Sequence, residues 1–374
     1  MSRIEYNNIV TYHPGYYVKE MIDELDITQD ELSKRLEVTS KYMSDFIKGK
    51  AKLSDDMALK LSKVFGTSIE LWLNLNKTYI EKEIEIRKRM TIDDEVELAR
   101  KIDYTFFVSL GLLPKKRNIV DKVDELQRYF KVASLKVLVR QDFLVQYKSA
   151  IAKINEVNVM NANAWVQTAI NIGREIETKS FDEKKLKSYI KEIRDMTVKE
   201  PKDFVDKLKG VMSECGVALV FMPHLKNCGV NGAVIWLNDK VILAINDRSK
   251  YADFFWFALF HEIGHVFQKR KKLLIISDQE SQAYVNSELM DMLEEEANLF
   301  AQETLIDEKD YKTFNGKSNI CSTDIVSFSK SINLHPGIVV GRLQRDGKLE
   351  FNQCNELRAK YEISNQRDGS SGSH

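Results

Sequence analysis

The sequence predicts a mainly helical protein with one small β-sheet, an α+β fold. Only five prolines and sixteen glycines interrupt the 374 residues, and long segments repeat apolar residues at helical spacing. One short region, residues 217–245, is instead rich in β-branched residues and contains an Asn-Asp pair suited to a hairpin turn. We expect four parts: a five-helix bundle at 1–80, a helical region at 81–199, a domain with the sheet at 200–364, and a disordered tail of artificial origin at 365–374.

The composition excludes several classes of protein. Basic and acidic residues number 56 each, so any basic surface for a nucleic acid must be local. No segment has the pattern of a signal peptide or of a membrane span, so we expect a cytoplasmic protein without a membrane partner. The cysteines lie far apart without CxxC spacing, which fits a reducing compartment and argues against a disulfide framework or a cysteine zinc site. They are Cys215, Cys228, Cys321 and Cys354.

The first 80 residues contain five short amphipathic segments separated by small turns. We expect helices at residues 16–25, 29–36, 40–48, 55–65 and 69–79. A residue with a side-chain oxygen precedes four of these segments, where an N-cap is needed. These residues are Thr28, Thr39, Ser54 and Ser68.

The second and third of these helices have helix-turn-helix spacing. Their apolar residues would face inward, while hydroxyl and amide groups would read base edges and lysines would neutralise phosphates. An alternative is a bundle used only for protein contacts. The candidate DNA-binding residues are Gln29, Thr39, Ser40, Lys41, Tyr42, Ser44, Lys48 and Lys50.

Residues 13–79 resemble the HigA-type branch of the Xre family of helix-turn-helix antitoxins and repressors. The HisProGly opening at 13–15 and the closing GTSIELWLNLNKTY at 66–79 carry this resemblance. It implies binding to operator DNA, a homodimer and a possible place in a toxin-antitoxin system. One residue departs from the family pattern, because Glu37 occupies the turn position where glycine is usual. Glu37 must accept a positive φ or the turn must rearrange, at a cost of roughly 1 kcal/mol.

The remaining chain divides at Pro201. Residues 81–199 are charged and helical in period without catalytic spacing, which indicates a connecting domain or a dimerisation arm. Beyond them, a helix to about residue 213 precedes strands at 217–222, 232–237 and 240–245. Helices follow at 251–268, 287–304, 322–331 and 336–344.

The segment FALFHEIGHVF at 257–267 places two histidines four residues apart in an apolar helix. His261 and His265 then lie one turn apart on the same face, and Glu262 lies beside them. This HExxH arrangement is typical of a zinc site in which the metal activates a water and the glutamate takes its proton. The alternative is a pair of core histidines, which would need two separate buried partners.

A third metal ligand is expected from a later helix. Gln268 and Lys271 exclude the metzincin pattern, so we expect a carboxylate. Glu294 shares a helix face with small residues that allow close approach to another helix, and with Asn298, an amide one turn on. We therefore predict that Glu294 is the third ligand and that Asn298 holds the second nitrogen of a histidine.

Residues 201–344 resemble the ImmA/IrrE family of intracellular zinc metallopeptidases. The resemblance rests on GVNGAVIWL through HEIGH at 229–265, on EEEANLFAQETL at 294–305 and on NLHPGIVVGRLQ at 333–344. It implies a zincin-like domain of the gluzincin type with one Zn²⁺ per chain on His261, His265 and Glu294, with Glu262 as general base. Substrates in that family are often helix-turn-helix repressors. The TLID sequence at 304–307 replaces the usual leucine-leucine-methionine-proline.

Two further groups could complete a peptidase site. His335, which precedes Pro336 at a predicted helix start, could hold the oxyanion, with Tyr311 and Arg342 behind it. An equally simple interpretation makes His335 a helix N-cap. The strand at 232–237 could bind an extended peptide along its edge.

We therefore expect a dimeric, operator-binding transcriptional regulator with its own zinc endopeptidase domain. Its substrate would be a regulatory protein, such as a helix-turn-helix repressor or a cognate toxin. A second hypothesis is an antitoxin-like repressor whose zinc domain is a sensor or scaffold without significant proteolysis. A third is a helical scaffold without metal.

Overall fold

The computed structural model describes residues 3–140, 143, 155–248, 250–269, 275–278, 287–317, 319–361 and 363. The chain divides into two compact units, Met1–Glu97 and Leu98–His374. The division falls within helix α5 (Ile69–Lys101), which also contains the boundary predicted at residue 80. The predicted tail at 365–374 lies outside the described residues.

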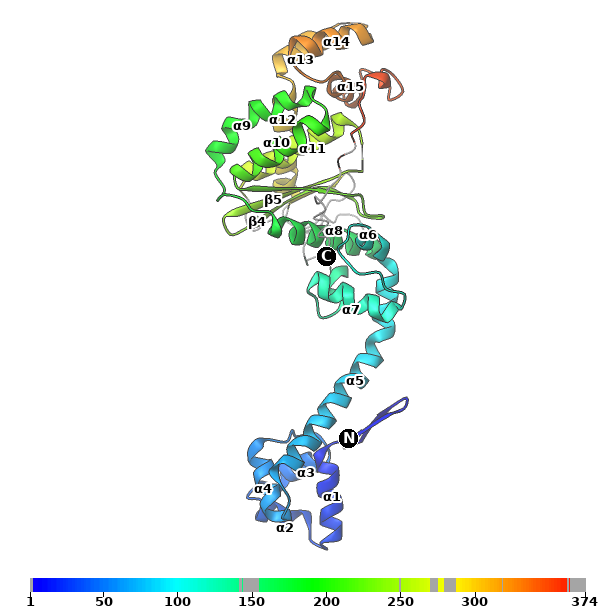
Figure 1. The fold of residues 1–374 in the computed structure, drawn as a ribbon, viewed down its shortest axis with the longest axis vertical. Coiled ribbons are helices and arrows are strands. Elements are labelled where there is room, and N and C mark those ends of the chain that lie inside the picture. The colour runs from blue at the N-terminus through cyan, green and yellow to red at the C-terminus, as the bar shows by residue number, and fades with distance from the viewer. Residues whose placement is uncertain are drawn as a thin grey trace, which may run out of the picture. The chain divides into compact units, whose positions relative to one another are not determined.

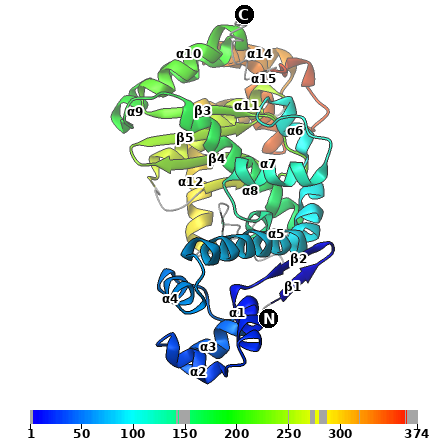
Figure 2. The same ribbon diagram turned by 60° about the horizontal axis from the view of Figure 1, so that its bottom comes forward.

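The first unit contains four short helices, most of α5 and an N-terminal hairpin that the sequence did not predict (Figure 2). The predicted N-caps Thr28, Thr39 and Ser54 accept backbone N–H groups, and Ser68 accepts one from Leu71, so all four are confirmed. The fifth predicted helix continues well beyond residue 79, to Lys101. The other elements are β1 (Arg3–Tyr6), β2 (Ile9–Tyr12), α1 (Pro14–Glu24), α2 (Gln29–Arg35), α3 (Ser40–Ile47) and α4 (Asp55–Phe65).

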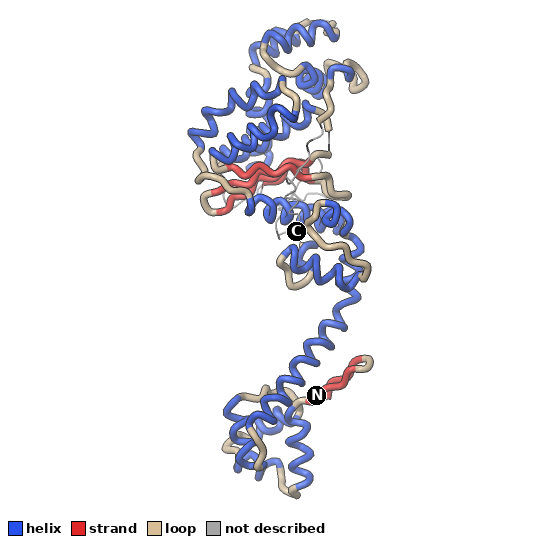
Figure 3. The backbone as a smooth tube through the Cα atoms, viewed as in Figure 1, coloured by secondary structure: helices blue, strands red, loops and turns tan. Residues whose placement is uncertain are grey.

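The second unit is built on a four-stranded mixed sheet, drawn in red between helices in Figure 3. Its strands are β3 (Val217–Met222), β4 (Val230–Leu237), β5 (Lys240–Asn246) and β6 (Ile275–Asp278), in the order β3-β5-β4-β6. The predicted hairpin joins β4 to β5, and Asn238 in its turn has a positive φ of 54°. β3 runs parallel to β5, and β6 runs antiparallel to β4.

Helices cover both faces of this sheet (Figure 1). Helix α8 (Glu156–Glu175) packs on one face, where a Cβ on Gly173 would lie 2.7 Å from the side chain of Ile242. The neighbours of Ile242 along β5, Val241 and Leu243, belong instead to the core shared with α9 (Glu183–Asp195), α10 (Pro201–Glu214) and α11 (Ala252–Phe267). Alternate side chains of one strand thus enter two layers, as expected for a sheet that is buried on both faces.

The mainly helical α+β prediction is therefore confirmed, although the individual helices of the helical region 81–199 were not assigned and α13 was not predicted. No helix among the described residues is long and apolar enough to cross a membrane. The remaining elements are α6 (Tyr104–Ser109), α7 (Ile119–Phe130), α12 (Ser287–Leu305), α13 (Glu308–Asn315), α14 (Ser322–Ser331) and α15 (Pro336–Arg345), with 3₁₀ turns at Leu135–Val139, Met196–Val198 and Asn355–Leu357.

Candidate metal centre and DNA-binding helix

Helix α11 carries the two histidines and is buried on nearly every side. Trp256, Phe260 and Ile263 have no exposed surface and fix the helix in the main core. Gly264 allows α12 to come close, because a Cβ at this position would lie 3.0 Å from the Cα of Ala297. This close packing of α11 and α12 brings Glu294 opposite the histidines.

The structure places the three predicted ligand side chains together. The Nε2 atoms of His261 and His265 are 3.0 Å apart, and the two carboxylate oxygens of Glu294 lie 3.4 and 3.3 Å from them. Ligands of a tetrahedral Zn²⁺ at about 2.0–2.1 Å from the metal are separated by about 3.3 Å. The spacing of these donor atoms therefore fits a small tetrahedral metal ion.

The outer nitrogens of both histidines are held by amide side chains. The Nδ1 of His261 lies 3.0 Å from Asn298 Oδ1, and the Nδ1 of His265 lies 2.9 Å from Gln268 Oε1. An amide oxygen can only accept a hydrogen bond, so each Nδ1 carries a proton, and each imidazole, when neutral, presents the lone pair of Nε2 to the centre. Gln268 is itself fixed by donating to the backbone oxygen of Leu293, 2.7 Å away. This role of Gln268 was not predicted, although its place three residues after His265 could have suggested it.

The electrostatics of the cluster favour a bound positive charge. Burial alone would lower the pKa of His265, but its hydrogen bond to Glu294 and the charge of Glu262 raise this pKa above its usual value. Burial would likewise raise the pKa of Glu294, but the hydrogen bonds from the two histidines lower it to about 2. A buried site that stabilises its carboxylate in the charged form is suited to a cation.

Glu262, the predicted general base, has no solvent-exposed surface. Its carboxylate packs against Gly232 of β4, where an added Cβ would lie only 2.2 Å from Oε1. Strand β4 therefore fixes the place of the glutamate, and it can do so only because residue 232 has no side chain. From the sequence alone, Gly232 is predicted only to lie in a strand.

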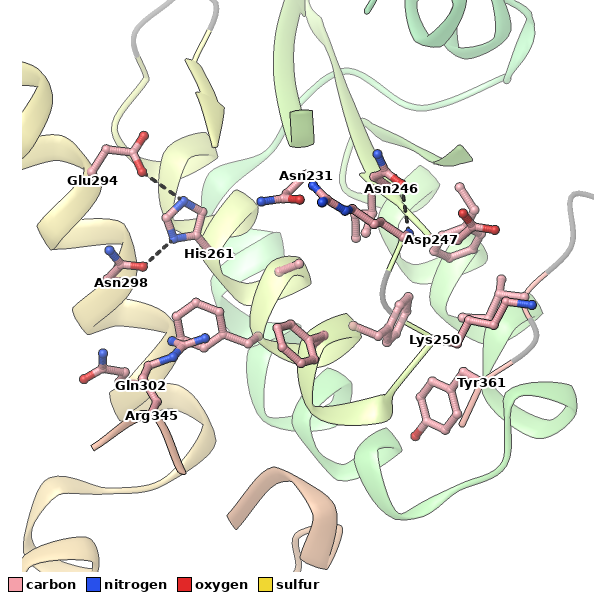
Figure 4. A pocket seen from close by; sticks show the side chains of 18 residues that line it. Asn231, Asn246, Asp247, Lys250, His261, Glu294, Asn298, Gln302, Arg345 and Tyr361 are labelled. Carbon is pink, nitrogen blue, oxygen red and sulfur yellow. Dashed lines mark hydrogen bonds and ion pairs between the residues drawn. The ribbon is translucent and has the colours of Figure 1, made fainter. Parts of the chain in front are cut away.

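A cavity of about 680 Å³ opens beside the cluster (Figure 4). His261, Glu294 and Asn298 line one part of it, and Asn231 and Asn246 from β4 and β5 line another. In the close-up, Glu294 and Asn298 flank His261, while Lys250 and Tyr361 lie far along the same cavity. The cavity offers room for a ligand next to the metal-binding side chains.

The side chains predicted to hold the oxyanion of a peptidase reaction do not line the cavity beside the metal-binding side chains. His335 is not among the residues that line the cavity, and its Nδ1 accepts a hydrogen bond from Gly337 N at 3.0 Å. It therefore caps α15, which was the alternative interpretation. Tyr311 and Arg342 both bind Asp346, at 2.6 and 2.8 Å. The structure gives no support to an oxyanion role for His335.

The edge of β4 is also occupied. β4 pairs with β5 on one side and with β6 on the other over Gly232–Val234. This part of the predicted edge at 232–237 is closed to an added peptide, and β6 is the outer strand. The prediction is therefore wrong for residues 232–234, because residues 275–278 were not expected to form a strand.

The helix-turn-helix elements α2 and α3 lie in the other unit. Glu37 in the turn has a φ of 53°, as its unusual position required. Leu32, Leu36, Met43 and Phe46 are buried as predicted.

The candidate DNA-binding side chains differ in their exposure and in the hydrogen bonds that they already form. Lys41, Lys48 and Lys50 are exposed and form no ion pair with any described residue. The hydroxyl of Thr39 instead caps α3, and that of Ser40 donates to Asp30 Oδ1 at 2.7 Å. The remaining candidates, Gln29, Tyr42 and Ser44, are half-buried.

Comparison with protein families gives two matches. A helix-turn-helix model matches residues 18–72, and the model of the IrrE N-terminal-like domain, a peptidase family named M78, matches residues 228–322. The second match includes Glu262, the three candidate ligands and Asn298, and it ends before His335. Peptidase M78 domains provide a candidate metal-dependent hydrolase site, which agrees with the cluster described above.

Individual relatives match about a fifth of the chain. The uncharacterised HTH-type transcriptional regulator YddM of Escherichia coli K12 is 38% identical over 72 residues, which are 19% of this chain and 77% of that protein. Virulence-associated protein A' of Dichelobacter nodosus is 44% identical over 68 residues, 18% of this chain and 59% of its own length. Among solved structures, a HigA-family addiction module antidote protein from Coxiella burnetii is 32% identical, with 22% of this chain and 91% of that chain covered and a TM-score of 0.21.

Proposed function

The chain belongs to the helix-turn-helix family of transcriptional regulators and carries an IrrE N-terminal-like domain, and we propose that it joins operator binding to zinc-dependent cleavage of a regulatory protein. The operator would be bound through α2 and α3. The protein cleaved would be a helix-turn-helix repressor or a cognate toxin. The observation that carries the peptidase proposal is the convergence of three ligand atoms beside a buried glutamate.

The residues of the site have separate tasks in this proposal. Zn²⁺ held by His261, His265 and Glu294 would supply a Lewis acid that makes a bound water acidic. Glu262 accepts the proton of the attacking water and delivers it to the leaving amine.

The surroundings keep this geometry fixed. Asn298 and Gln268 hold the two imidazoles in the tautomer that leaves Nε2 free. The apolar side chains of α11 exclude bulk water from the cluster, and the adjoining cavity would receive the peptide.

The peptidase proposal is tested by expressing the full chain together with its genomic neighbours. We expect a neighbouring protein to be lost with the wild type and to persist with Glu262→Gln, which removes the base and keeps the zinc ligands. Zinc content of the purified variant provides the control. Loss of the neighbour with both forms, or with neither, would contradict proteolysis by this site.

A second candidate is a zinc domain that senses or scaffolds without significant proteolysis. It is favoured by the complete burial of Glu262, which has no exposed surface from which to reach a water. In that case Glu262→Gln would leave repression and the neighbouring proteins unchanged, while removal of zinc would alter operator binding.

The DNA-binding half is supported by the exposed lysines of α3 and the residues after it. Lys41, Lys48 and Lys50 can reach phosphates while α3 lies in the major groove. We propose a homodimer, because two such helices would read two half-sites about one helical turn apart. Footprinting of the upstream DNA should then show a site with approximate two-fold symmetry.

A further inference from the structure

Three arginines line a second cavity, of about 400 Å³, in the second unit. Arg342 binds Asp346 at 2.8 Å, and Arg358 binds Asp253 at 2.8 Å. Arg345 forms no ion pair with any described residue, although it lies on the same helix as Arg342. The nearby carboxylates already have partners, so the guanidinium of Arg345 remains available to a ligand.

A stacking contact fixes Arg345 close to the metal cluster. Its guanidinium carbon lies 3.7 Å from the ring centroid of Phe257. Phe257 precedes His261 by one turn of α11, and the centroids of these two rings are 6.1 Å apart. Stacking uses the face of the guanidinium and leaves its N–H edge free for a planar acceptor.

Arg345 also stands where two cavities adjoin. It lines the 680 Å³ cavity beside His261 and also the 400 Å³ cavity, and the two share Phe254, Phe257 and Gln302 as well. Figure 4 shows Arg345 and Gln302 next to each other, on the α12 side of the cavity. A peptide bound along the larger cavity would therefore pass the N–H edge of Arg345.

The charges that line the larger cavity also favour a ligand with a carboxylate. Beyond Glu294, its charged lining consists of Arg248, Lys250, Arg345 and Asp247. Asp247 already accepts a hydrogen bond from the backbone of His224 at 2.8 Å. The excess of positive charge favours a ligand that brings a carboxylate.

We infer that Arg345 is a specificity-determining residue that binds a carboxylate of the peptide in this cavity. The inference rests on the proposed peptidase function and goes beyond it by naming the substrate class. The carboxylate would come from an Asp or Glu side chain or from the free C-terminus of the peptide. Both accept the paired N–H groups of a guanidinium in the same bidentate geometry.

Binding can be measured without turnover in the zinc-loaded Glu262→Gln protein. The probes are three sets of short fluorescent peptides of otherwise random sequence. One set has a fixed Glu and an amidated end, one has Gln in place of Glu and an amidated end, and one has Gln and a free C-terminus. We expect one of the two carboxylate-bearing sets to bind roughly tenfold more tightly than the Gln amide set. Which set gains affinity identifies the source of the carboxylate.

Variants of Arg345 separate recognition from structure. Arg345→Gln should remove the difference between the sets, and Arg345→Lys should retain only part of it because an ammonium lacks the fork. Lys348→Gln, which removes one positive charge from an exposed residue just after α15, should leave the difference unchanged. A purely structural Arg345 would change the affinity of all three sets equally.

The outcomes distinguish this inference from the proposed function. Equal binding of the three sets, no measurable binding of any set, or a preference that survives Arg345→Gln would overturn the role of Arg345. A carboxylate preference in Glu262→Gln together with a wild type that cleaves none of the peptides would overturn the peptidase proposal and leave the inference standing.

Discussion

Substitution of Gly232 by alanine tests whether β4 positions the general base. An alanine Cβ would lie 2.2 Å from Glu262 Oε1, 2.5 Å from Cδ and 2.7 Å from Cγ. The shortest of these distances is about 1.3 Å below the ~3.5 Å at which non-bonded heavy atoms pack best. Because Glu262 is fully buried, its carboxylate must be displaced or the strand must move.

The size of the effect follows from this overlap. Overpacking of a buried position costs roughly 1–3 kcal/mol of folding stability. A displacement of about 1 Å in a catalytic group lowers the rate by roughly 100-fold. We therefore expect Gly232→Ala to remain folded, to keep its zinc because no ligand is touched, and to lose at least about 100-fold in kcat.

The assay compares peptide cleavage, zinc content and thermal unfolding for three proteins. The matched control is Gly210→Ala in α10, where an added Cβ meets nothing within 4 Å. This control should keep full activity and gain about 0.4–1 kcal/mol of stability, since a helical glycine is replaced. Cleavage by Gly232→Ala at the wild-type rate would refute the claim that β4 holds Glu262 in place.

Three other predictions concern metal, DNA and thiol chemistry. Zinc affinity, measured by competition with a chromogenic chelator, should fall as the pH is lowered, starting above the pKa of an ordinary imidazole, because the raised pKa of His265 lets protons compete for its lone pair; a flat profile would contradict this. Lys41→Ala combined with Lys48→Ala should weaken operator binding and reduce the slope of log K against log salt by about 1.8; an unchanged slope would show that neither lysine meets a phosphate. Burial raises the pKa of Cys215 to about 11, so alkylation of the native protein near pH 8 should label the exposed Cys321 and spare Cys215 until unfolding, as mass spectrometry would show. Labelling of Cys215 before unfolding would argue against its burial.

The parts of the site that the sequence predicted are those set by local helical geometry. His261 and His265 lie on one helix face by periodicity, and the small residues beside Glu294 are those that let α12 approach α11. Gly232 and Arg345 could not be found in this way. Their positions depend on a strand and a helix that lie far from His261 in sequence and meet it only after folding.

The end of α5 was also predicted wrongly, because the sequence pattern used does not reveal every source of helix stability. The apolar periodicity of α5 fades after residue 79, because its later residues are mostly charged, yet the helix continues to Lys101. Ion pairs one turn apart, such as Arg87 with Glu83 and Arg89 with Glu85, supply support that an apolar pattern does not reveal. A prediction based on a buried apolar stripe therefore ends this helix too early.

The two His-Pro-Gly sequences explain why His335 was a poor candidate for catalysis. In both His13 and His335, Nδ1 accepts a hydrogen bond of 3.0 Å from the N–H of the glycine two residues on, and proline begins the helix. Each glycine is needed for close packing, since a Cβ on Gly15 would lie 2.0 Å from Phe46 O and one on Gly337 would lie 3.0 Å from Leu357 O. The same local structure thus occurs in two units, only one of which holds the metal cluster. A helix-capping task common to both is sufficient to account for the histidine.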